Sequence, residues 1–303
     1  METPAVERAA YVRVYAMLVL VMLFWAGNSI VGRAVHQEIA PFPLALARWA
    51  GAFLVLAPFA WKHVRADWPM ARKHWRVILL LGVLGVAAFN ALLYSGLAYT
   101  TATNSVLIQA GIPAVVLLLG LTLYRERPAP AQVIGVTIAA LGAAVIVARG
   151  DLSVLAALRF GYGDVLIVIA ALIWAFYTVL LRARPPIHPF SFLLLTFAIG
   201  VIAMAPLAAG EWETRPLQLT PNVLAAMAYV AVLPSVVAYF LYNKAVAAIG
   251  ASDAGQMLSL QPLLGAVLAW VFLREPLLEF HYFGMALIAL GIALPLATRA
   301  RKA

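Results

Sequence analysis

The chain alternates long apolar runs with short charged segments. Its longest uncharged run, residues 77–124, contains no Asp, Glu, Lys or Arg over 48 residues. A membrane-spanning helix needs about 20 mostly apolar residues, so this run is long enough for two spans. The polar segment 99–104 is the natural break between them. The same criterion predicts ten spanning helices, near residues 14–32, 43–61, 77–98, 103–124, 129–148, 164–181, 189–209, 221–246, 252–273 and 280–298.

The composition agrees with a membrane protein. Hydrophobic residues make up 65% of the chain and charged residues 11%, against about 25% charged residues in soluble domains. Because the chain contains no cysteine, disulfides, thiolate metal sites and cysteine nucleophiles are excluded. The first span resembles a signal peptide, but its apolar run exceeds the usual length of about 7–15 residues, so we interpret it as a span that is retained.

The basic residues predict the orientation. Fifteen Lys and Arg residues fall on the side that would carry both termini, and five fall on the other side. This bias predicts a multi-pass protein of the cell inner (plasma) membrane with both termini in the cytoplasm. It also accounts for the net charge of +9, so the lipid bilayer is the expected partner and nucleic acid is not.

The sequence repeats itself at an offset of 149 residues. Trp25 aligns with Trp174, Arg33 with Arg182, Pro113 with Pro262, and the dipeptide 125–126 with 274–275. Each copy, 1–149 and 150–303, holds five spans, so the second copy enters the membrane from the opposite side. The predicted fold is therefore an all-α membrane protein built from two inverted five-helix repeats, an arrangement typical of transporters whose substrate binds between the halves.

Four features resemble the EamA-type branch of the drug/metabolite transporter superfamily. They are the tryptophan-led segments 25–28 and 174–177, the segment 94–102, the spacing from Pro113 to Glu126 echoed from Pro262 to Glu275, and the glycine-rich closing helices 135–142 and 284–291. The resemblance implies export of amino acids, other metabolites or drugs. It also implies a cavity lined by the first, third, fourth, sixth, eighth and ninth helices, with the fifth and tenth lying aside.

Polar and aromatic residues inside the spans are the cavity candidates, because polar groups at membrane depth usually face the bundle interior. Amides and hydroxyls can orient a zwitterion, and indole and phenol rings can stack on apolar groups. Interhelical hydrogen bonding, or interface anchoring for the two tryptophans, remains the alternative. The candidates are Trp25, Asn28, Ser29, Asn90, Tyr94, Asn104, Gln109, Trp174, Tyr177, Tyr239, Asn243, Gln256 and Gln261.

Two cations and two prolines complete the set. Arg48 could pair with a substrate carboxylate or phosphate, but its position soon after Pro43 favours snorkelling to the surface. Lys244 could reach either the cavity or the cytoplasmic surface. Pro113 and Pro262 are hinge candidates, because proline frees a backbone carbonyl and permits a bend; a static kink is the alternative.

The sequence contains no motif for catalysis, metal binding or ATP binding, so we expect no enzyme activity, no metal and no cofactor. The prediction is an alternating-access exporter of small polar metabolites, amino acids first. A multidrug exporter is the runner-up, and an intramembrane enzyme or a channel is a distant alternative. Because no mid-span carboxylate or histidine is found, facilitated diffusion or exchange is expected rather than proton antiport. A homodimer is a possible oligomeric state that the sequence does not decide.

Overall fold

The computed structural model describes residues 4–100, 102–151, 153, 161–214 and 218–300. These ranges contain ten helical segments long and apolar enough to cross a membrane, which confirms the predicted fold class. The first repeat contains α1 (Pro4–Ala34), α2 (Pro41–Lys73), α3 (Trp75–Gly82), the π-helix η1 (Val83–Ala88), α4 (Phe89–Leu97), α5 (Ala102–Ala110), α6 (Ile112–Tyr124) and α7 (Pro130–Val147). The second contains α9 (Tyr162–Leu180), the 3-10 helix η2 (Leu181–Ala183), α10 (Pro189–Thr214), α11 (Pro221–Ala231), the π-helix η3 (Val232–Val237), α12 (Ala238–Ile249), α13 (Ala251–Gln256), the 3-10 helix η4 (Met257–Ser259), α14 (Leu260–Leu273) and α15 (Glu279–Ala300).

Several of these segments run on through short breaks. The third span joins α3, η1 and α4, and the eighth joins α11, η3 and α12. The predicted break within residues 77–124 falls between α4 and α5. The second span is longer than expected, because α2 continues to Lys73.

The two halves repeat these details at the 149-residue offset. The π-helices η1 and η3 lie 149 residues apart, as do the left-handed helix caps Arg125 and Arg274, both with φ of 56°. Helix α1 packs against α12 and α14, and the equivalent α9 packs against α4 and α6. This exchange of contacts is what two inverted repeats around a pseudo-two-fold axis would produce.

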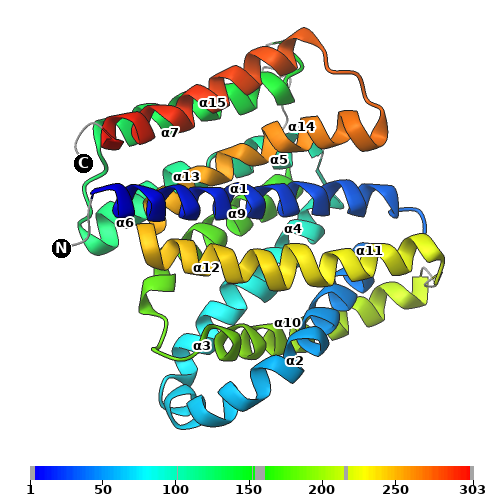
Figure 1. The fold of residues 1–303 in the computed structure, drawn as a ribbon. Helices are drawn as coiled ribbons and strands as arrows, with labels where there is room; N and C mark the ends of the chain where they lie inside the picture. Colours follow the sequence, from blue (N-terminus) through cyan, green and yellow to red (C-terminus); the bar gives the residue numbers. More distant parts are fainter. Residues whose placement is uncertain (1–3, 101, 152, 154–160, 215–217, 301–303) are drawn as a thin grey trace.

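Helices α1, α12 and α14, with α9, α4 and α6, form the middle of the bundle (Figure 1). On one flank α7 packs against α15, and on the other α2 packs against α10. Both described chain ends lie at the same end of the bundle, which we call the termini side (Figure 1). The fifth and tenth spans therefore lie aside, as the resemblance implied.

The α7–α15 contact depends on four glycines. A Cβ at Gly135 would lie 2.3 Å from the carbonyl oxygen of Gly291, and one at Gly142 would lie 2.6 Å from that of Gly284. These two crossings are equivalent under the repeat, and small residues permit such close approach of membrane helices. The glycines thus support packing within the chain.

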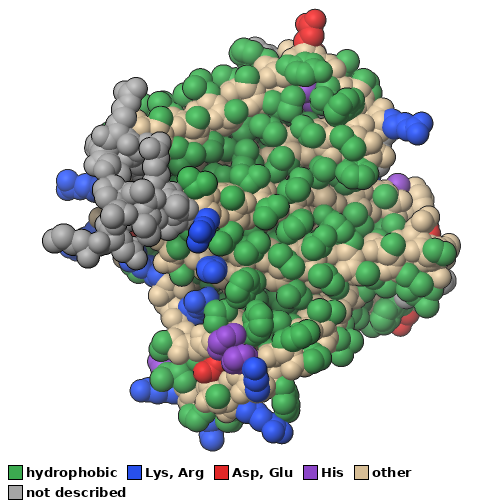
Figure 2. All heavy atoms as spheres, viewed as in Figure 1, with side chains coloured by type: hydrophobic (Ala, Val, Ile, Leu, Met, Phe, Trp, Pro, Cys, Tyr) green, Lys and Arg blue, Asp and Glu red, His purple; other side chains and the backbone are tan. Residues whose placement is uncertain are grey.

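The outer surface is strongly apolar. Figure 2 shows hydrophobic side chains covering the middle of one face, with several Lys and Arg side chains gathered toward the termini side. Leu54, Phe59 and Phe272 are each more than 60% exposed. So large an apolar surface fits a lipid environment and would be a liability in water.

Candidate functional site

Two tryptophans from equivalent positions meet between the halves. The ring centroids of Trp25, on α1, and Trp174, on α9, are 5.2 Å apart in an edge-to-face arrangement. Both side chains are buried. They are therefore interior residues of the bundle, and the interface-anchor alternative for them is wrong.

Three tyrosines surround this pair. The rings of Tyr239 and Tyr242, on α12, lie 5.1–5.9 Å from both tryptophan rings. Tyr177, one turn after Trp174, lies 5.2 Å from the Trp174 ring. We call these five residues the aromatic centre. Edge-to-face and tilted contacts of this kind contribute about 0.5–1.5 kcal/mol each beyond the burial of area.

The π-helices supply acceptors to the aromatic centre. Trp25 Nε1 donates to the carbonyl oxygen of Pro234 at 2.9 Å, and the Tyr239 hydroxyl donates to that of Gly85 at 2.7 Å. Gly85 and Pro234 occupy equivalent positions in η1 and η3. A π-helix displaces backbone hydrogen bonds from the usual register and often occurs at functional sites. Each half therefore offers one main-chain oxygen to a ring at the centre.

The amides of the third and eighth spans lie beside these groups. Tyr177 donates to Asn243 Oδ1 at 2.9 Å, while Asn243 Nδ2 has no hydrogen-bond partner. Asn90 Nδ2 donates to the carbonyl oxygen of Val86 at 2.8 Å, within its own span. Tyr94 is half-buried, and its ring centroid lies 6.2 Å from that of Phe42.

Arg48 corrects one expectation from the sequence. The residue does not snorkel: it is 5% exposed, and its guanidinium lies 4.5 Å from the Trp49 ring. Its Nε donates to Ser235 Oγ at 2.6 Å, and its Nη2 to the Pro234 carbonyl oxygen at 3.3 Å. These acceptors in η3 hold the side chain inward, which a position near the start of the span could not reveal.

Two other candidates lie at the surface, and a third is only partly buried. Ser29 and Lys244 are exposed, and Asn28 is half-buried. In the helical register, Ser29 and Lys244 each follow a residue that faces inward or partly inward, so they turn to the surface. The structure therefore does not bring Ser29 or Lys244 to the centre.

Two buried carboxylates lie near opposite ends of the bundle. Asp164, at the start of α9, accepts hydrogen bonds from Asn104 Nδ2 at 2.9 Å and from Thr100 Oγ1. Asp253, at the start of α13, accepts one from Gln132 Nε2 at 2.6 Å. Asn104 and Asp253 are equivalent under the repeat, and both carboxylates belong to the second half, Asp164 on its first span and Asp253 on its fourth.

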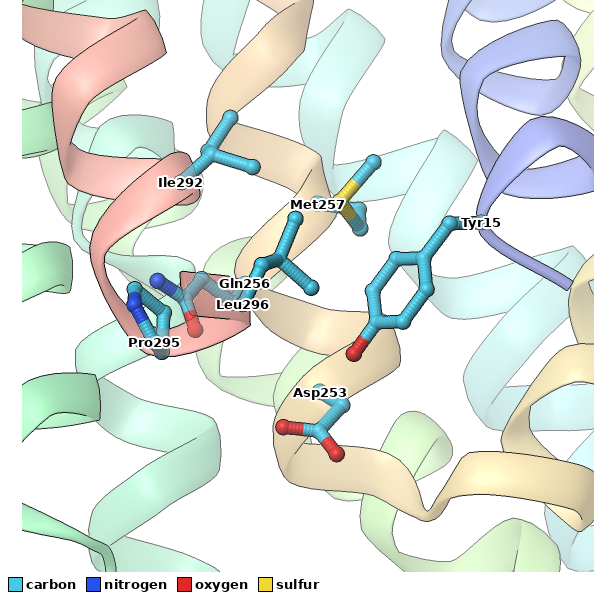
Figure 3. A pocket seen from close by; sticks show the side chains of 7 residues that line it. All are labelled: Tyr15, Asp253, Gln256, Met257, Ile292, Pro295 and Leu296. Atoms are coloured by element: carbon cyan, nitrogen blue, oxygen red, sulfur yellow. The ribbon is translucent and has the colours of Figure 1, made fainter. Parts of the chain in front are cut away.

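A small pocket on the termini side borders Asp253. The hydroxyl of Tyr15 points toward the Asp253 carboxylate, and Gln256, Met257 and Ile292 line the same space (Figure 3). Tyr15 is the repeat equivalent of Asp164. Each end of the bundle thus has a first-span and a fourth-span polar residue facing each other.

The three glutamine candidates bond away from the aromatic centre. Gln109 Nε2 donates to Ser105 Oγ at 3.0 Å, Gln256 Nε2 to the carbonyl oxygen of Gly291 at 3.0 Å, and Gln261 Nε2 lies 3.9 Å from the sulfur of Met22. Gln109 thus bonds within its own helix, and Gln256 bonds to the backbone of α15.

The proline candidates lie at helix interruptions. Pro113 follows the break between α5 and α6, and Pro262 lies in the first turn of α14, after the 3-10 segment η4. The fourth and ninth spans are therefore interrupted at corresponding positions.

Ion pairs close the two ends. Arg33, at the end of α1, pairs with Glu275 at 2.8 Å, and Arg182, after α9, pairs with Glu126. The two pairs are equivalent under the offset and lie on opposite sides of the bundle, with Arg182–Glu126 on the termini side. Each joins the first span of one half to the end of the fourth span of the other.

Four residues of this region were missed from the sequence: Trp49, Phe197, Ser235 and Tyr242. Tyr242 lies within 5.9 Å of both central tryptophans, and Trp49 lies 5.5 Å from Tyr239. A usable signal existed for two of them, because Tyr242 lies three residues after Tyr239 on the same helix face and Phe197 is the repeat equivalent of Arg48. Ser235 had no signal, because only the π-helix turns it toward Arg48.

Comparisons with known proteins give one consistent family. The EamA-like transporter family matches residues 12–148 and 161–296, two segments that begin 149 residues apart. An uncharacterized transporter of Archaeoglobus fulgidus is 29% identical over 94% of this chain and 98% of its own. A probable terminal-alkyne amino-acid exporter of Streptantibioticus cattleyicolor is 26% identical over 91% of each chain. A crystal structure at 19% identity shares the fold, with a TM-score of 0.73 over 96% of this chain and 99% of that chain. With ten spanning helices and this match over both halves, the chain belongs to the EamA-like transporter family.

Proposed function

We propose that this protein is an alternating-access exporter of amino acids or related small metabolites. The observation that carries the proposal is the meeting of Trp25 and Trp174, one from each half, at the centre of the bundle. A site shared by two similar halves can open to either side when the halves rock against each other. The name of the Streptantibioticus relative, a probable terminal-alkyne amino-acid exporter, supports the substrate class.

The proposed membrane is the cell inner (plasma) membrane, with the termini side in the cytoplasm. The excess of Lys and Arg on that side supports this orientation. Among the basic residues counted, Arg159, Arg215, Arg301 and Lys302 lie outside the described residues.

Movement would centre on the fourth and ninth spans. Their interruptions near Pro113 and Pro262 support a hinge role, because broken helices bend more readily than continuous ones. Transport would proceed by facilitated diffusion or exchange, since the buried carboxylates Asp164 and Asp253 lie near the ends of their spans and are already hydrogen-bonded.

Counterflow into proteoliposomes tests the proposal. Proteoliposomes that contain the purified protein would be loaded with unlabelled amino acids, nucleosides or cationic drugs. The same compound in labelled form would then be added outside, and its uptake measured. We expect saturable exchange of amino acids, reduced at least fivefold in Trp25→Ala, and unchanged in Trp61→Ala, whose side chain is 55% exposed. Folded protein that exchanges none of the panel would refute the carrier and favour a channel or an enzyme.

Multidrug export is the second candidate function, favoured by the aromatic character of the centre. Aromatic rings accommodate many apolar ligands and attract cations through their π faces. In the same experiment, exchange of cationic drugs without exchange of amino acids would select this alternative.

A further inference from the structure

Among the described residues, no carboxylate neutralises the buried positive charge of the Arg48 guanidinium. Its two hydrogen bonds go to neutral acceptors, Ser235 Oγ and the Pro234 carbonyl oxygen. Neither of the ion pairs described above, Arg33–Glu275 and Arg182–Glu126, involves Arg48. A charge inside a membrane protein is costly and ordinarily has a partner, which marks Arg48 as a functional group.

Two further donors in this region lack partners. Trp49 Nε1 is fully buried with no acceptor, and Asn243 Nδ2 is buried with none. Buried polar groups are almost always paired, so each unpaired group calls for an explanation. The guanidinium has five N–H groups, of which two make the bonds described above. All the unsatisfied groups are therefore donors, and an acceptor-rich anion would satisfy them.

The π-helix η3 connects Arg48 to the aromatic centre. The carbonyl oxygen of Pro234 accepts from both Arg48 Nη2 and Trp25 Nε1. Ser235 donates its own hydroxyl proton to the carbonyl oxygen of Val230 at 2.8 Å, which leaves its oxygen free to accept from Arg48. A ligand that contacts the tryptophan pair would therefore lie close to the Arg48 guanidinium, because Trp25 and Arg48 bond to the same carbonyl oxygen.

The cation breaks the symmetry of the site. The repeat equivalent of Arg48 is Phe197, whose ring lies 5.4 Å from Trp49 and 6.1 Å from Tyr239. One half therefore contributes a cation where the other contributes an apolar ring. Such a site fits a molecule with one anionic end and one apolar end, and it disfavours cations.

We infer that Arg48, with the indole N–H of Trp49, binds the carboxylate of the substrate, and that the aromatic centre holds its apolar part. This inference rests on the proposed transport function and narrows its substrate to carboxylates that carry an apolar or aromatic group. Arg48 is the specificity-determining residue, and Ser235 is a positioning residue that orients it. The planar guanidinium suits a carboxylate because both can bond through two parallel contacts.

Binding and transport would be measured separately, with three probes: phenylalanine, 3-phenylpropionate and phenylalaninamide. Binding would be read from the tryptophan fluorescence of detergent-purified protein. Transport would be read from how strongly each probe inhibits the exchange of labelled amino acid in proteoliposomes. We expect wild-type protein to bind the two carboxylates about tenfold or more tightly than the amide, the range for a hydrogen bond to a charged group. Arg48→Gln should lose this preference, and Arg48→Lys should keep part of it.

Arg72→Gln is the matched control, because Arg72 is an exposed cation on the same helix. Its carboxylate preference should equal that of the wild type. Ser235→Ala should lower the preference while leaving the melting temperature of the protein closer to wild type than Arg48→Gln does.

The outcomes separate the two proposals. Arg48-dependent binding of carboxylates without any exchange would refute the carrier and leave the binding site standing. Equal binding of carboxylates and amide by wild-type protein, or a preference retained in folded Arg48→Gln, would overturn the role of Arg48. Exchange of cationic drugs with no carboxylate binding would overturn it as well.

Discussion

At the residue scale, several buried polar groups bond to partners far away along the chain. Tyr177 and Asn243 are 66 residues apart, and Tyr239 and Gly85 are 154 apart. An unpaired polar group in the apolar interior costs about 1–3 kcal/mol, so each of these bonds favours one arrangement of the helices. Single hydroxyl groups can therefore be tested by removing one oxygen atom.

Tyr177→Phe keeps the ring and removes the donor to Asn243 Oδ1. Because the whole amide of Asn243 would then be buried without a partner, we expect a loss of about 1–3 kcal/mol in the free energy of unfolding. Thermal melts in detergent would measure it. Tyr162→Phe, at a ring that is 67% exposed, should leave the melting temperature unchanged. Equal shifts in the two variants would contradict the prediction.

His188 lies in the short connection before α10, where its imidazole stacks on that of His63 with ring centroids 3.6 Å apart. Burial, and secondarily the nearby His63, lower the pKa of His188 below its ordinary value of 6.5, although Asp67 opposes this. The folded protein therefore binds fewer protons at His188 than the unfolded chain. The contribution to stability is complete above pH 6.5 and declines as the pH falls through the lowered pKa.

A titration of His188 by NMR would check this prediction. We expect its pKa below 6.5 in the wild-type protein and closer to 6.5 in His63→Gln, which removes the second cause. A His188 pKa at or above 6.5 in the wild-type protein would contradict it.

At the element scale, corresponding spans of the two halves are altered in the same places. The π-helices interrupt the third and eighth spans, and breaks near Pro113 and Pro262 interrupt the fourth and ninth. By contrast, α7 runs without interruption from Pro130 to Val147, and its glycines fit closely against α15. Helices α7 and α15 thus form a closely packed pair of regular helices, while the third, fourth, eighth and ninth spans contain the irregular backbone.

Gly135→Ala should weaken the α7–α15 contact, because the new methyl group would collide with the Gly291 carbonyl oxygen. Overpacking of this kind costs about 1–3 kcal/mol. Gly265→Ala in α14 is the control, since nothing lies within 4 Å of a Cβ there and alanine favours helix over glycine. Melting temperatures in detergent should fall for the first variant and stay equal or rise for the second.

At the scale of the whole molecule, equivalent ion pairs close both ends at once. Arg33–Glu275 and Arg182–Glu126 are exposed pairs, with side chains 44–65% accessible, so each contributes only about 0–1 kcal/mol. Small terms of nearly equal size at opposite ends suit a transporter, because neither end would be locked shut. Breaking one pair should bias the molecule toward opening at that end alone.

Spin-label distances would test this, and the cysteine-free chain gives no background labelling. Label pairs at Ala34 and Phe272, and at their repeat equivalents Ala183 and Leu123, report on the two ends. We expect Arg182→Gln to increase the open population at the 183/123 pair about two- to fivefold and to leave the 34/272 pair unchanged. Arg33→Gln should do the reverse. Equal changes at both ends in either variant would contradict independent closure.

The sequence by itself determined the ten spans and the 149-residue repeat, because a spanning helix satisfies its own backbone and needs only a sufficient length of apolar residues. It also singled out Trp25, Trp174, Tyr177, Tyr239 and Asn243 as interior residues, which the structure shows to be buried, since polar and aromatic residues at membrane depth stand out against an apolar background. It could not separate inward from outward positions on a helix that is apolar all round, which is why Ser29 and Lys244 were included.

Only the tertiary structure decided which helix faces meet. The position of Arg48 in its span favoured the surface, yet η3 offers it two acceptors in the interior. Those acceptors come from residues 186 and 187 positions away, and the π-helix that exposes them leaves no mark in the hydrophobic pattern. The side-chain environment at the centre thus depends on contacts between the halves, whereas the number and order of the spans depend on local composition alone.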